Sequence, residues 1–283
     1  MNYRHLYHAG NFSDAFKHVT LTSLIHSLLR KDTPFFYLDT HAGTGYYDLL
    51  SALAQKNKEH AHGILKLLEQ DKVPPLIKRY LDCVRQINNR LSQAKFTSFR
   101  YYPGSPYIVR HFLRPKDRII LCELQPQEHQ SLKTAFAADP QVAIHHSDGF
   151  LGLKAFLPPR ERRGLVLIDP PYENLNEWTQ INSALLIALK RWETGIYAMW
   201  YPVKERAIVE RFHRSMQETI RQPMLVAELS IYREDIPNRL NGSGMLLINP
   251  PWQFQNEIDV ALPWLWETLA VDQQGSYRSY WLR

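Results

Sequence analysis

The amino-acid sequence predicts an α/β protein with a doubly wound, Rossmann-like parallel sheet of seven strands. Short runs rich in β-branched and aromatic residues alternate with segments of helical length along most of the chain, which is the pattern of a sheet covered by helices on both faces. The runs "RIILCEL" and "GLVLIDP" are apolar almost throughout, as expected of strands buried on both sides.

The expected elements begin with these runs and end at polar, glycine or proline residues. Most helices fall between two strands, as crossover connections require. Strands are expected at residues 35–39, 118–123, 142–146, 164–169, 196–200, 224–231 and 244–249. Helices are expected at residues 14–30, 127–138, 178–192, 204–219 and 256–269.

One interval departs from this alternation. Residues 47–101 contain the helical patterns "GILKLLEQ" and "LIKRYLDCVRQINNRL" and no convincing strand, and they are longer than one crossover needs. We therefore expect a single domain, residues 1–283, with a small helical insertion at 47–101. The cations of this interval fit either a solvated helix face or a surface that faces RNA; they are Lys66, Lys78, Arg79, Arg85 and Arg90.

Composition limits the possible classes of protein. With 45% hydrophobic and 22% charged residues, the chain can form a core, and no apolar run approaches the roughly 20 residues of a membrane span. The N-terminus has no apolar signal region, and Cys83 and Cys122 are too few for a disulfide framework or a zinc site, so a reduced, cytosolic protein is expected. The net charge of +6 and pI of about 9.2 favour a polyanionic partner such as nucleic acid.

A glycine-bearing turn follows the first expected strand in "FFYLDTHAGTGYY". Gly43 and Gly45 would let the backbone pass close to a nucleoside cofactor. The dinucleotide pattern G-x-G-x-x-G requires a third glycine where this chain has Asp48. The turn therefore favours a cofactor without pyrophosphate, of which S-adenosylmethionine is the obvious example, although two glycines are also common in ordinary turns.

Two acids follow the next strands at the edge where open α/β sheets bind ligands. Glu123 ends "RIILCEL", where its carboxylate could accept hydrogen bonds from both ribose hydroxyls, and Asp148 in "HHSDGF" could accept one from an adenine amino group. Either acid could instead cap the following helix. The ordered series of glycine turn, Glu123, Asp148 and D-P-P-Y indicates a class I S-adenosylmethionine-dependent methyltransferase.

Two segments match the motif D/N/S-P-P-Y/F/W, which is associated with methyl transfer to amino nitrogens: "DPPY" at Asp169 and "NPPW" at Asn249. An exocyclic amino nitrogen is a poor nucleophile because its lone pair is delocalised into the ring. A carboxylate and a backbone carbonyl can accept its two N–H groups and favour a tetrahedral nitrogen. Pro170 offers no competing N–H, Tyr172 can stack on an extruded base, and alignment rather than a metal is required.

Position distinguishes the two copies of the motif. Asp169 follows the fourth strand, which in the usual class I order lies beside the strand with the glycine turn, so Asp169 is expected at the cofactor. Asn249 ends what is counted as the last strand, toward the far edge of the sheet. There N-P-P-W is expected to terminate a strand and to anchor Trp252 in packing.

Several longer segments resemble one family. The segments "YRHLYHAGNFSDAFKH", "YLDTHAGTGYY", "YYPGSP", "ADPQ…SDGF", "GLVLIDPPYE", "WYPV" and "SGMLLINPPW" are similar to methyltransferase J of the large ribosomal subunit (RlmJ), nearly from end to end. The N-terminal segment and "YYPGSP" are more specific than D-P-P-Y. The resemblance implies N6-methylation of one adenine in 23S rRNA with S-adenosylmethionine, on a class I domain with a small helical insertion.

The resemblance also implies roles for individual residues. Asp169 takes the catalytic position, and Lys17 and His5 match a positively charged N-terminal motif close to it, so we count Lys17 with the catalytic residues. Tyr3 matches a position linked to substrate RNA, and we expect residues 1–9 to lie over the mouth of the site, with Tyr3 and His5 touching RNA. The implied cofactor contacts, to which the glycine turn adds Gly43, are His18, His41, Ser105, Glu123, Asp148, Gly149 and Asp169.

Other interpretations remain open at this stage. Lys17 and His18 could be ordinary residues on a solvated face of the first helix. His41 could stabilise a turn, and Ser105 could cap a helix. The substrate could instead be DNA or a protein amide, or the chain could be a non-catalytic RNA-binding assembly factor. We expect a cytoplasmic monomer that needs no metal and no membrane and acts on 23S rRNA, either deproteinised or in an early assembly intermediate.

Overall fold

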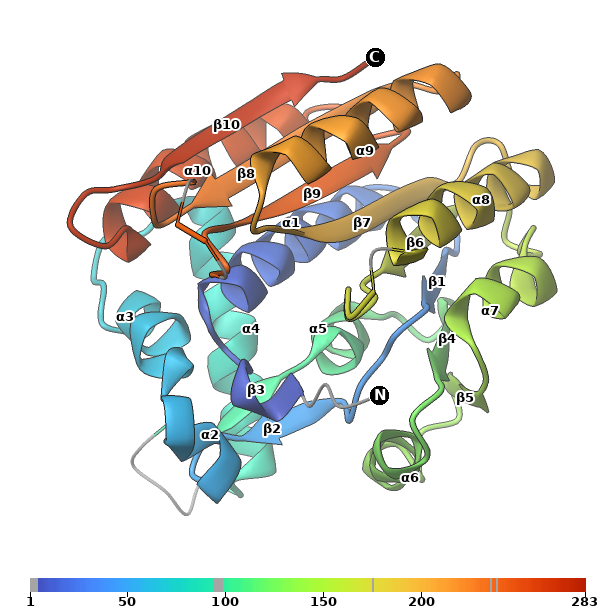
Figure 1. Cartoon of the computed structure of the whole chain (residues 1–283). Coiled ribbons are helices and arrows are strands. Elements are labelled where there is room, and N and C mark those ends of the chain that lie inside the picture. The colour runs from blue at the N-terminus through green and yellow to red at the C-terminus, as the bar shows by residue number, and fades with distance from the viewer. Residues whose placement is uncertain (1–4, 94–98, 175, 235, 238) are drawn as a thin grey trace.

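The computed structural model describes residues 5–93, 99–174, 176–234, 236–237 and 239–283. At its centre is an eight-stranded sheet with the order β10-β8-β9-β7-β6-β1-β4-β5 (Figure 1). Its strands are β1 (Phe36–Asp39), β4 (Arg118–Glu123), β5 (Val142–His146), β6 (Gly164–Ile168), β7 (Ile196–Val203), β8 (Met224–Ser230), β9 (Gly242–Ile248) and β10 (Ser276–Trp281).

The order and directions of the strands confirm the α/β, class I expectation. β5, β4, β1, β6 and β7 are parallel neighbours, whereas β9 is antiparallel to both β7 and β8. The sheet has eight strands rather than seven, because β10 pairs with β8 at the edge. Residues of β10 are mostly exposed, so this strand lacks the apolar run that revealed the others. β9 is therefore not the last strand, contrary to our expectation.

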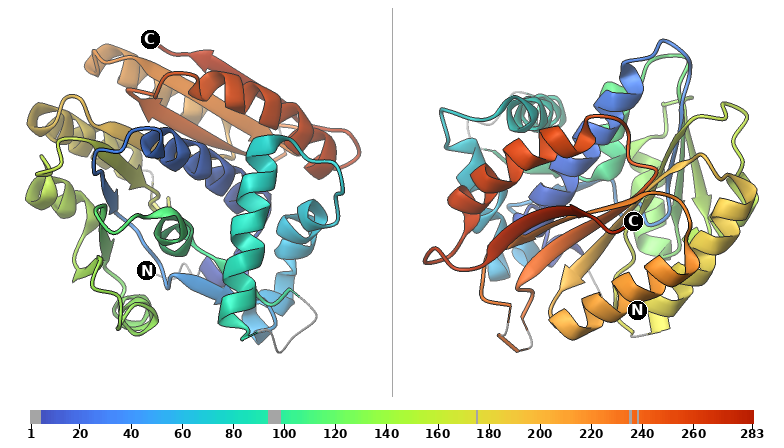
Figure 2. Two further views of the ribbon diagram at one scale, coloured as in Figure 1. Left: turned by 180° about the vertical axis from the view of Figure 1, so that it is seen from behind. Right: turned by 90° about the horizontal axis from the view of Figure 1, so that it is seen from above.

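Helices cover both faces of the sheet (Figure 2). Along β6, Leu165 and Leu167 belong to one core while Val166 and Ile168 belong to the other, as the two-residue period of a strand requires. Burial on both faces is thus confirmed. One core contains side chains of α1 (Phe12–Leu29), α5 (Ser105–Phe112), α6 (Pro126–Ala135) and α10 (Phe254–Leu269), and the other those of α7 (Gly149–Phe156), α8 (Asn176–Arg191) and α9 (Arg206–Thr219).

The interval between β1 and α5 contains short helices and two short strands. β2 (Tyr46–Asp48) and β3 (Tyr101–Pro103) form an antiparallel pair, so the expectation of no strand here was wrong at both ends of the interval. Three residues per strand are too few for a recognisable alternation. Between them lie α2 (Ala52–Asn57), η2 (Glu59–His62), α3 (Ile64–Leu68) and α4 (Pro75–Leu91).

The expected cations of this interval lie among acids. In α4, Lys78 Nζ is 2.6 Å from Asp82 Oδ2, and Arg85 lies 3.7 Å from the other oxygen of the same carboxylate. Arg79 approaches Glu257 of α10 at 4.0 Å. Tyr80 on the opposite side of α4 is fully buried, so one face of the helix packs on the sheet domain and the other carries these pairs.

The sheet directions bring six strand ends to one edge. Val203, at the end of β7, lies opposite Gly242, and Gly242 lies opposite Ser230, at the end of β8. β8 therefore points the same way as β7, and the carboxyl ends of β1, β4, β5, β6, β7 and β8 meet at one edge, where ligands of such sheets bind. In the described part of the chain, no helix combines the length and apolar character needed to span a membrane.

Candidate active site

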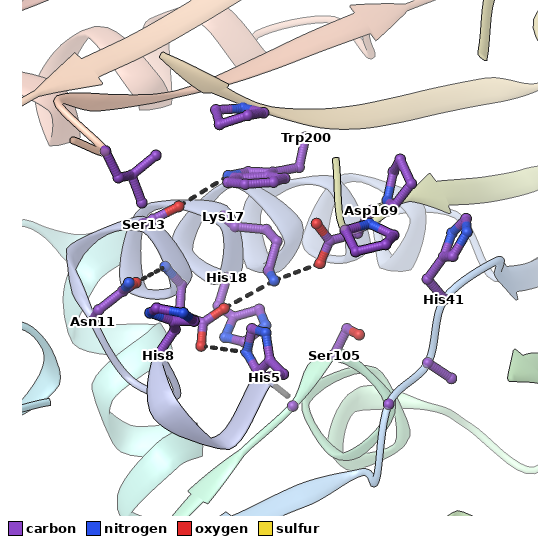
Figure 3. Close-up of a pocket in the computed structure, with 18 of the residues that line it drawn as sticks. His5, His8, Asn11, Ser13, Lys17, His18, His41, Ser105, Asp169 and Trp200 are labelled. Atoms are coloured by element: carbon purple, nitrogen blue, oxygen red, sulfur yellow. Dashed lines mark hydrogen bonds and ion pairs between the residues drawn. The ribbon is translucent and has the colours of Figure 1, made fainter. Parts of the chain in front are cut away.

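A cavity of about 800 Å³ opens at this edge between the strand ends and the start of α1. Its walls bring together residues that are far apart in the sequence (Figure 3). Tyr172 is not among the residues that line it, and Tyr3 lies outside the described residues. Among the residues singled out from the sequence, the cavity is lined by His5, Lys17, His18, His41, Gly43, Ser105, Glu123, Asp148, Gly149, Asp169 and Pro170.

A chain of charged side chains crosses the cavity floor. Lys17 Nζ lies 2.6 Å from Asp169 Oδ2 and 2.9 Å from Asp14 Oδ1, and His5 Nε2 lies 2.8 Å from Asp14 Oδ2. Burial opposes the charge of Lys17, but Asp14 and Asp169 outweigh it and raise the lysine pKa well above its usual value. Burial likewise opposes the charge of Asp14, but His5 and Lys17 hold its pKa well below the usual range.

The N-terminus of α1 positions these charges. Asn11 caps the helix by accepting a hydrogen bond from the Asp14 backbone N–H at 2.9 Å, and Gly10 N donates to Asp14 Oδ2 at 3.0 Å. Because the sheet, α4, α5 and α10 surround α1, Lys17 and His18 are only 5% and 1% exposed. The alternative of a solvated first helix is therefore wrong for both residues.

Glu123 and the glycine turn form the next wall. Gly43 N donates to Glu123 Oε2 at 2.8 Å, and Gln125 N donates to Oε1 at 2.7 Å. Gly43 has φ +64°, and a Cβ there would lie 2.4 Å from the Tyr47 hydroxyl, so only glycine fits. Burial raises the pKa of Glu123 although these backbone N–H groups oppose the shift.

Asp148 and His41 lie beside them. Asp148 caps α7, because its Oδ1 accepts hydrogen bonds from Phe150 N at 2.7 Å and Leu151 N at 3.2 Å. A Cβ on Gly149 would lie 2.0 Å from the Thr40 carbonyl oxygen. His41 packs edge-on against Phe150 with ring centroids 5.5 Å apart, and burial lowers its pKa to about 4, so the imidazole is neutral at pH 7.

Asp39 is a carboxylate that we did not predict for the site. It ends β1, is fully buried, and accepts hydrogen bonds from Tyr37 OH at 2.8 Å and Ser105 Oγ at 2.7 Å. Burial raises its pKa to about 6. The N-cap of α5 is Gly104 rather than Ser105; the Ser105 hydroxyl instead donates to Asp39. The signal was present in "YLDTHAG", but an acid at a strand end resembles any polar turn residue.

His18 belongs to a hydrogen-bonded chain below the cavity. Its Nδ1 lies 2.7 Å from Tyr102 OH, which lies 3.0 Å from Tyr80 OH. Burial lowers the pKa of His18 to about 3, so this imidazole is also neutral at pH 7. α4, which carries Tyr80, thus reaches the site through two hydroxyl groups.

Trp200 of β7 is one of the aromatic residues that line the cavity. Its Nε1 donates to Ser243 Oγ at 2.7 Å and to Ser13 Oγ at 3.0 Å, and its ring lies 6.0 Å from Lys17 Nζ. Tyr172 adopts φ +51° and donates its hydroxyl to the Trp200 carbonyl oxygen at 2.6 Å. Its ring packs on Trp178 at 4.6 Å. The segment "WYPV" contained Trp200, but nothing in its pattern indicated which face of β7 meets the cavity.

The second P-P motif lies at the opposite edge of the sheet. β9 is antiparallel to β7, so Asn249 lies near the beginning of β7 while Asp169 lies near its middle. Asn249 Nδ2 donates to the carbonyl oxygens of Glu193 and Gly195 at 2.7 and 2.8 Å. It closes a turn, as a strand terminator should. The expectation that Trp252 is anchored in packing was wrong, because this side chain is 80% exposed.

Comparisons with known proteins agree with this geometry. The family model described as ribosomal RNA large subunit methyltransferase D, RlmJ, matches residues 32–283. The chain belongs to this family. It is 39% identical over 282 residues to ribosomal RNA large subunit methyltransferase J of Escherichia coli (strain K12), covering 100% of this chain and 99% of that one. The Haemophilus influenzae protein of the same name is 38% identical with the same coverage.

A solved structure shares the fold over almost the whole chain. The crystal structure of protein LPL1258 from Legionella pneumophila str. Philadelphia 1 superposes with a TM-score of 0.85 at 37% identity, covering 97% of each chain. Family and fold together confirm the resemblance that the sequence motifs indicated.

Proposed function

We propose that this protein transfers a methyl group from S-adenosylmethionine to the N6 atom of one adenine in 23S rRNA. Its family membership makes it a ribosomal RNA large subunit methyltransferase. The observation that supports the proposed chemistry best is the partly buried Asp169 carboxylate, held by Lys17 in the cavity that Glu123 and Gly43 also line. D-P-P-Y at this position is the pattern expected for an amino-nitrogen substrate.

The polar groups that line the cavity fit S-adenosylmethionine. Glu123 keeps a carboxylate at the end of β4, oriented by Gly43 N and Gln125 N, where it would hold the ribose hydroxyls. Asp148 would accept from the adenine amino group, and the cradle at Gly43 and Gly149 leaves no room for a Cβ. When bound, the cofactor supplies an electrophilic methyl group on a sulfonium. His18, His41 and Ser105 would complete its binding site.

The residues around Asp169 would prepare the nucleophile. We assign to Asp169 the acceptance of one N6–H group of the target adenine and to a backbone carbonyl of the motif the acceptance of the other, which favours a tetrahedral nitrogen. Lys17 holds the Asp169 carboxylate in place. Pro170 contributes no competing N–H. Trp200 and, after a rotation from its present contacts, Tyr172 offer aromatic surfaces for the extruded base.

The substrate side of the proposal involves the N-terminal residues. His5 lines the cavity and, with Tyr3, would contact RNA. We further propose that residues 1–283 form a single domain with an insertion at 47–101, that the enzyme acts as a monomer in the cytoplasm, and that it uses deproteinised 23S rRNA or an early assembly intermediate. Methyl transfer from a sulfonium requires alignment of donor and acceptor, for which these side chains suffice without a metal.

Transfer of tritium from labelled S-adenosylmethionine tests the substrate class. The purified protein is incubated separately with deproteinised 23S rRNA, 16S rRNA, genomic DNA and total protein. We expect label in 23S rRNA alone. Label in DNA or protein would show that the enzyme methylates that class of molecule instead. Absence of transfer to every pool would favour a non-catalytic RNA-binding assembly factor.

A further inference from the structure

The cavity extends past the proposed cofactor site to a second wall formed by Lys204, Tyr232 and Arg239, which we call the basic wall. None of these residues takes part in the chemistry assigned above. Lys204 and Arg239 are exposed, and Tyr232 is half-buried. An exposed pair of cations along the mouth of a cavity that would receive a nucleotide is positioned to contact a ligand of opposite charge.

Strand order explains why this wall lies at the active-site edge. Lys204 directly follows β7, and Tyr232 and Arg239 lie between the end of β8 and the start of β9, both of which are at the same edge. Ser13 Oγ donates to Ser243 Oγ at 2.9 Å, which ties the end of this connection to the start of α1. His8 Nδ1 lies 3.0 Å from both carboxylate oxygens of Glu59, and Lys204 lines the same cavity as these two residues.

The two sides of the mouth differ in charge. On the side of the 47–101 interval the cavity is lined by Asn57, Glu59 and His62, and Glu59 carries a carboxylate. Arg206, which follows Lys204 by two residues and does not line the cavity, is neutralised by Glu228 at 2.9 Å and Glu234 at 2.6 Å. By contrast, Lys204 and Arg239 form no ion pair within the described ranges. A polyanion that enters the cavity is therefore attracted to the basic wall.

Arg239 is also held in a defined orientation. Its guanidinium carbon lies 3.6 Å from the ring centroid of Tyr232. Stacking on an aromatic face fixes the planar cation without consuming its N–H groups, which remain available to phosphate oxygens. This arrangement suits a phosphodiester better than a carboxylate-bearing small molecule, because the cavity beside it would already hold the cofactor and the target base.

We propose that the basic wall binds the RNA backbone beside the target adenosine, with Arg239 and Lys204 each contacting a phosphate and Tyr232 holding Arg239. This inference rests on the proposed function. The wall would govern how tightly RNA binds and how its target nucleotide is presented, but not the methyl transfer step, because its side chains lie away from Asp169 and Glu123 on a separate part of the lining.

The test compares a double variant, Arg239→Gln with Lys204→Gln, with a control that removes the same charge elsewhere. Arg221 precedes β8 at the opposite edge of the sheet, and Lys190 lies near the end of α8; both are exposed. The control variant is therefore Arg221→Gln with Lys190→Gln. Filter binding to 23S rRNA is measured from about 50 to 200 mM salt, the range in which phosphate contacts are lost. Calorimetry measures S-adenosylmethionine binding.

Removing two phosphate contacts should lower the salt slope of log Kd by about 1 per contact. At about 0.1 M salt that slope corresponds to about five- to eightfold weaker RNA binding for each charge lost. Cofactor affinity and kcat at saturating RNA should equal those of the parent, and the control should bind RNA as the parent does. Tyr232→Phe should bind normally, whereas in a Tyr232→Ala background the effect of Arg239→Gln should shrink.

The outcomes separate the two proposals. If the parent methylates 23S rRNA and the double variant binds it as the control does, the basic wall does not bind RNA. The proposed function stands in that case. If the parent methylates no RNA but the double variant alone loses salt-dependent RNA binding, the methyltransferase proposal fails and the RNA-binding wall remains. Equal losses in the double variant and the control would show a general charge effect and overturn the wall.

Discussion

Lys17 Nζ lies 2.6 Å from Oδ2 of Asp169 although the two residues are 152 positions apart. The same ammonium group lies 2.9 Å from Asp14, so one buried cation serves two carboxylates. The cluster of Lys17, Asp14 and Asp169 therefore has a formal charge of −1 when His5 is neutral. Such a site favours a positively charged sulfonium nearby, and it keeps the Asp169 carboxylate oriented toward the cavity.

Asp169→Ala should abolish methyl transfer while Asn249→Ala keeps most of it. Asp169 accepts a hydrogen bond from the reacting nitrogen in the proposed mechanism, and loss of such a group costs on the order of a hundred- to a thousandfold in rate. Asn249 only bonds two carbonyl oxygens at the far edge, so its loss should lower stability by about 1–3 kcal/mol. Single-turnover rates and thermal melts measure both effects. Equal loss of activity in two folded variants would contradict the assignment.

Glu123→Gln should weaken S-adenosylmethionine binding about ten- to a hundredfold, equivalent to about 1.5–3 kcal/mol. Both carboxylate oxygens already accept backbone N–H groups, from Gly43 and Gln125. An amide must turn its NH₂ toward one of these donors, which disturbs the glycine turn as well as the ribose contact. Isothermal calorimetry provides the measurement. Affinity equal to the parent would remove Glu123 from the cofactor site.

Asp39→Asn should remove a pH-dependent part of the stability. Burial raises the pKa of Asp39 from 3.8 to about 6, so between about pH 4 and 6 the folded protein binds a proton that the unfolded chain lacks. Its contribution to the free energy of unfolding therefore grows on acidification through this window, by on the order of 2–3 kcal/mol in total. Urea denaturation at several pH values should give a parent-minus-variant difference that falls as pH rises from 4 to 6. A pH-independent difference would refute the raised pKa.

Deleting residues 1–8 should cut turnover on rRNA at least tenfold while leaving cofactor affinity nearly unchanged. The deletion removes His5 from Asp14 and His8 from Glu59, but Lys17 keeps both carboxylate partners. An N-terminal segment over the mouth would help to retain a flipped base, as closing segments do in other enzymes. Steady-state kinetics with 23S rRNA and calorimetry with the cofactor distinguish the two effects. Parental turnover in the truncated protein would mean that the segment is an ordinary tail.

Much of this arrangement could be predicted from the sequence because polar residues at strand ends carry a strong signal. Gly43, Glu123, Asp148 and Asp169 each follow an apolar run, and parallel strands bring such ends to one edge. The same reasoning placed the two P-P motifs apart. The prediction that β9 is the last strand was wrong because β10 follows it. β10 is mostly exposed and therefore has no apolar pattern in the sequence.

The remainder depended on tertiary contacts that no local pattern encodes. Burial of Lys17 results from α4, α5 and α10 packing around α1. Trp200 lines the cavity and Tyr172 does not, because Tyr172 adopts φ +51° and donates to the Trp200 carbonyl oxygen while two serines hold the indole. Trp252 was expected to be anchored in packing where N-P-P-W ends a strand, yet its side chain is exposed to solvent.

Nucleoside analysis of a single product tests the central claim most directly. Transcribed 23S rRNA is incubated with the protein and S-adenosylmethionine, digested to nucleosides and examined by mass spectrometry, with Asp169→Ala as the control. The proposed function predicts N6-methyladenosine approaching one residue per rRNA molecule for the parent and none for the variant. Methylation of another nucleoside or position, or equal N6-methyladenosine from both proteins, would contradict it.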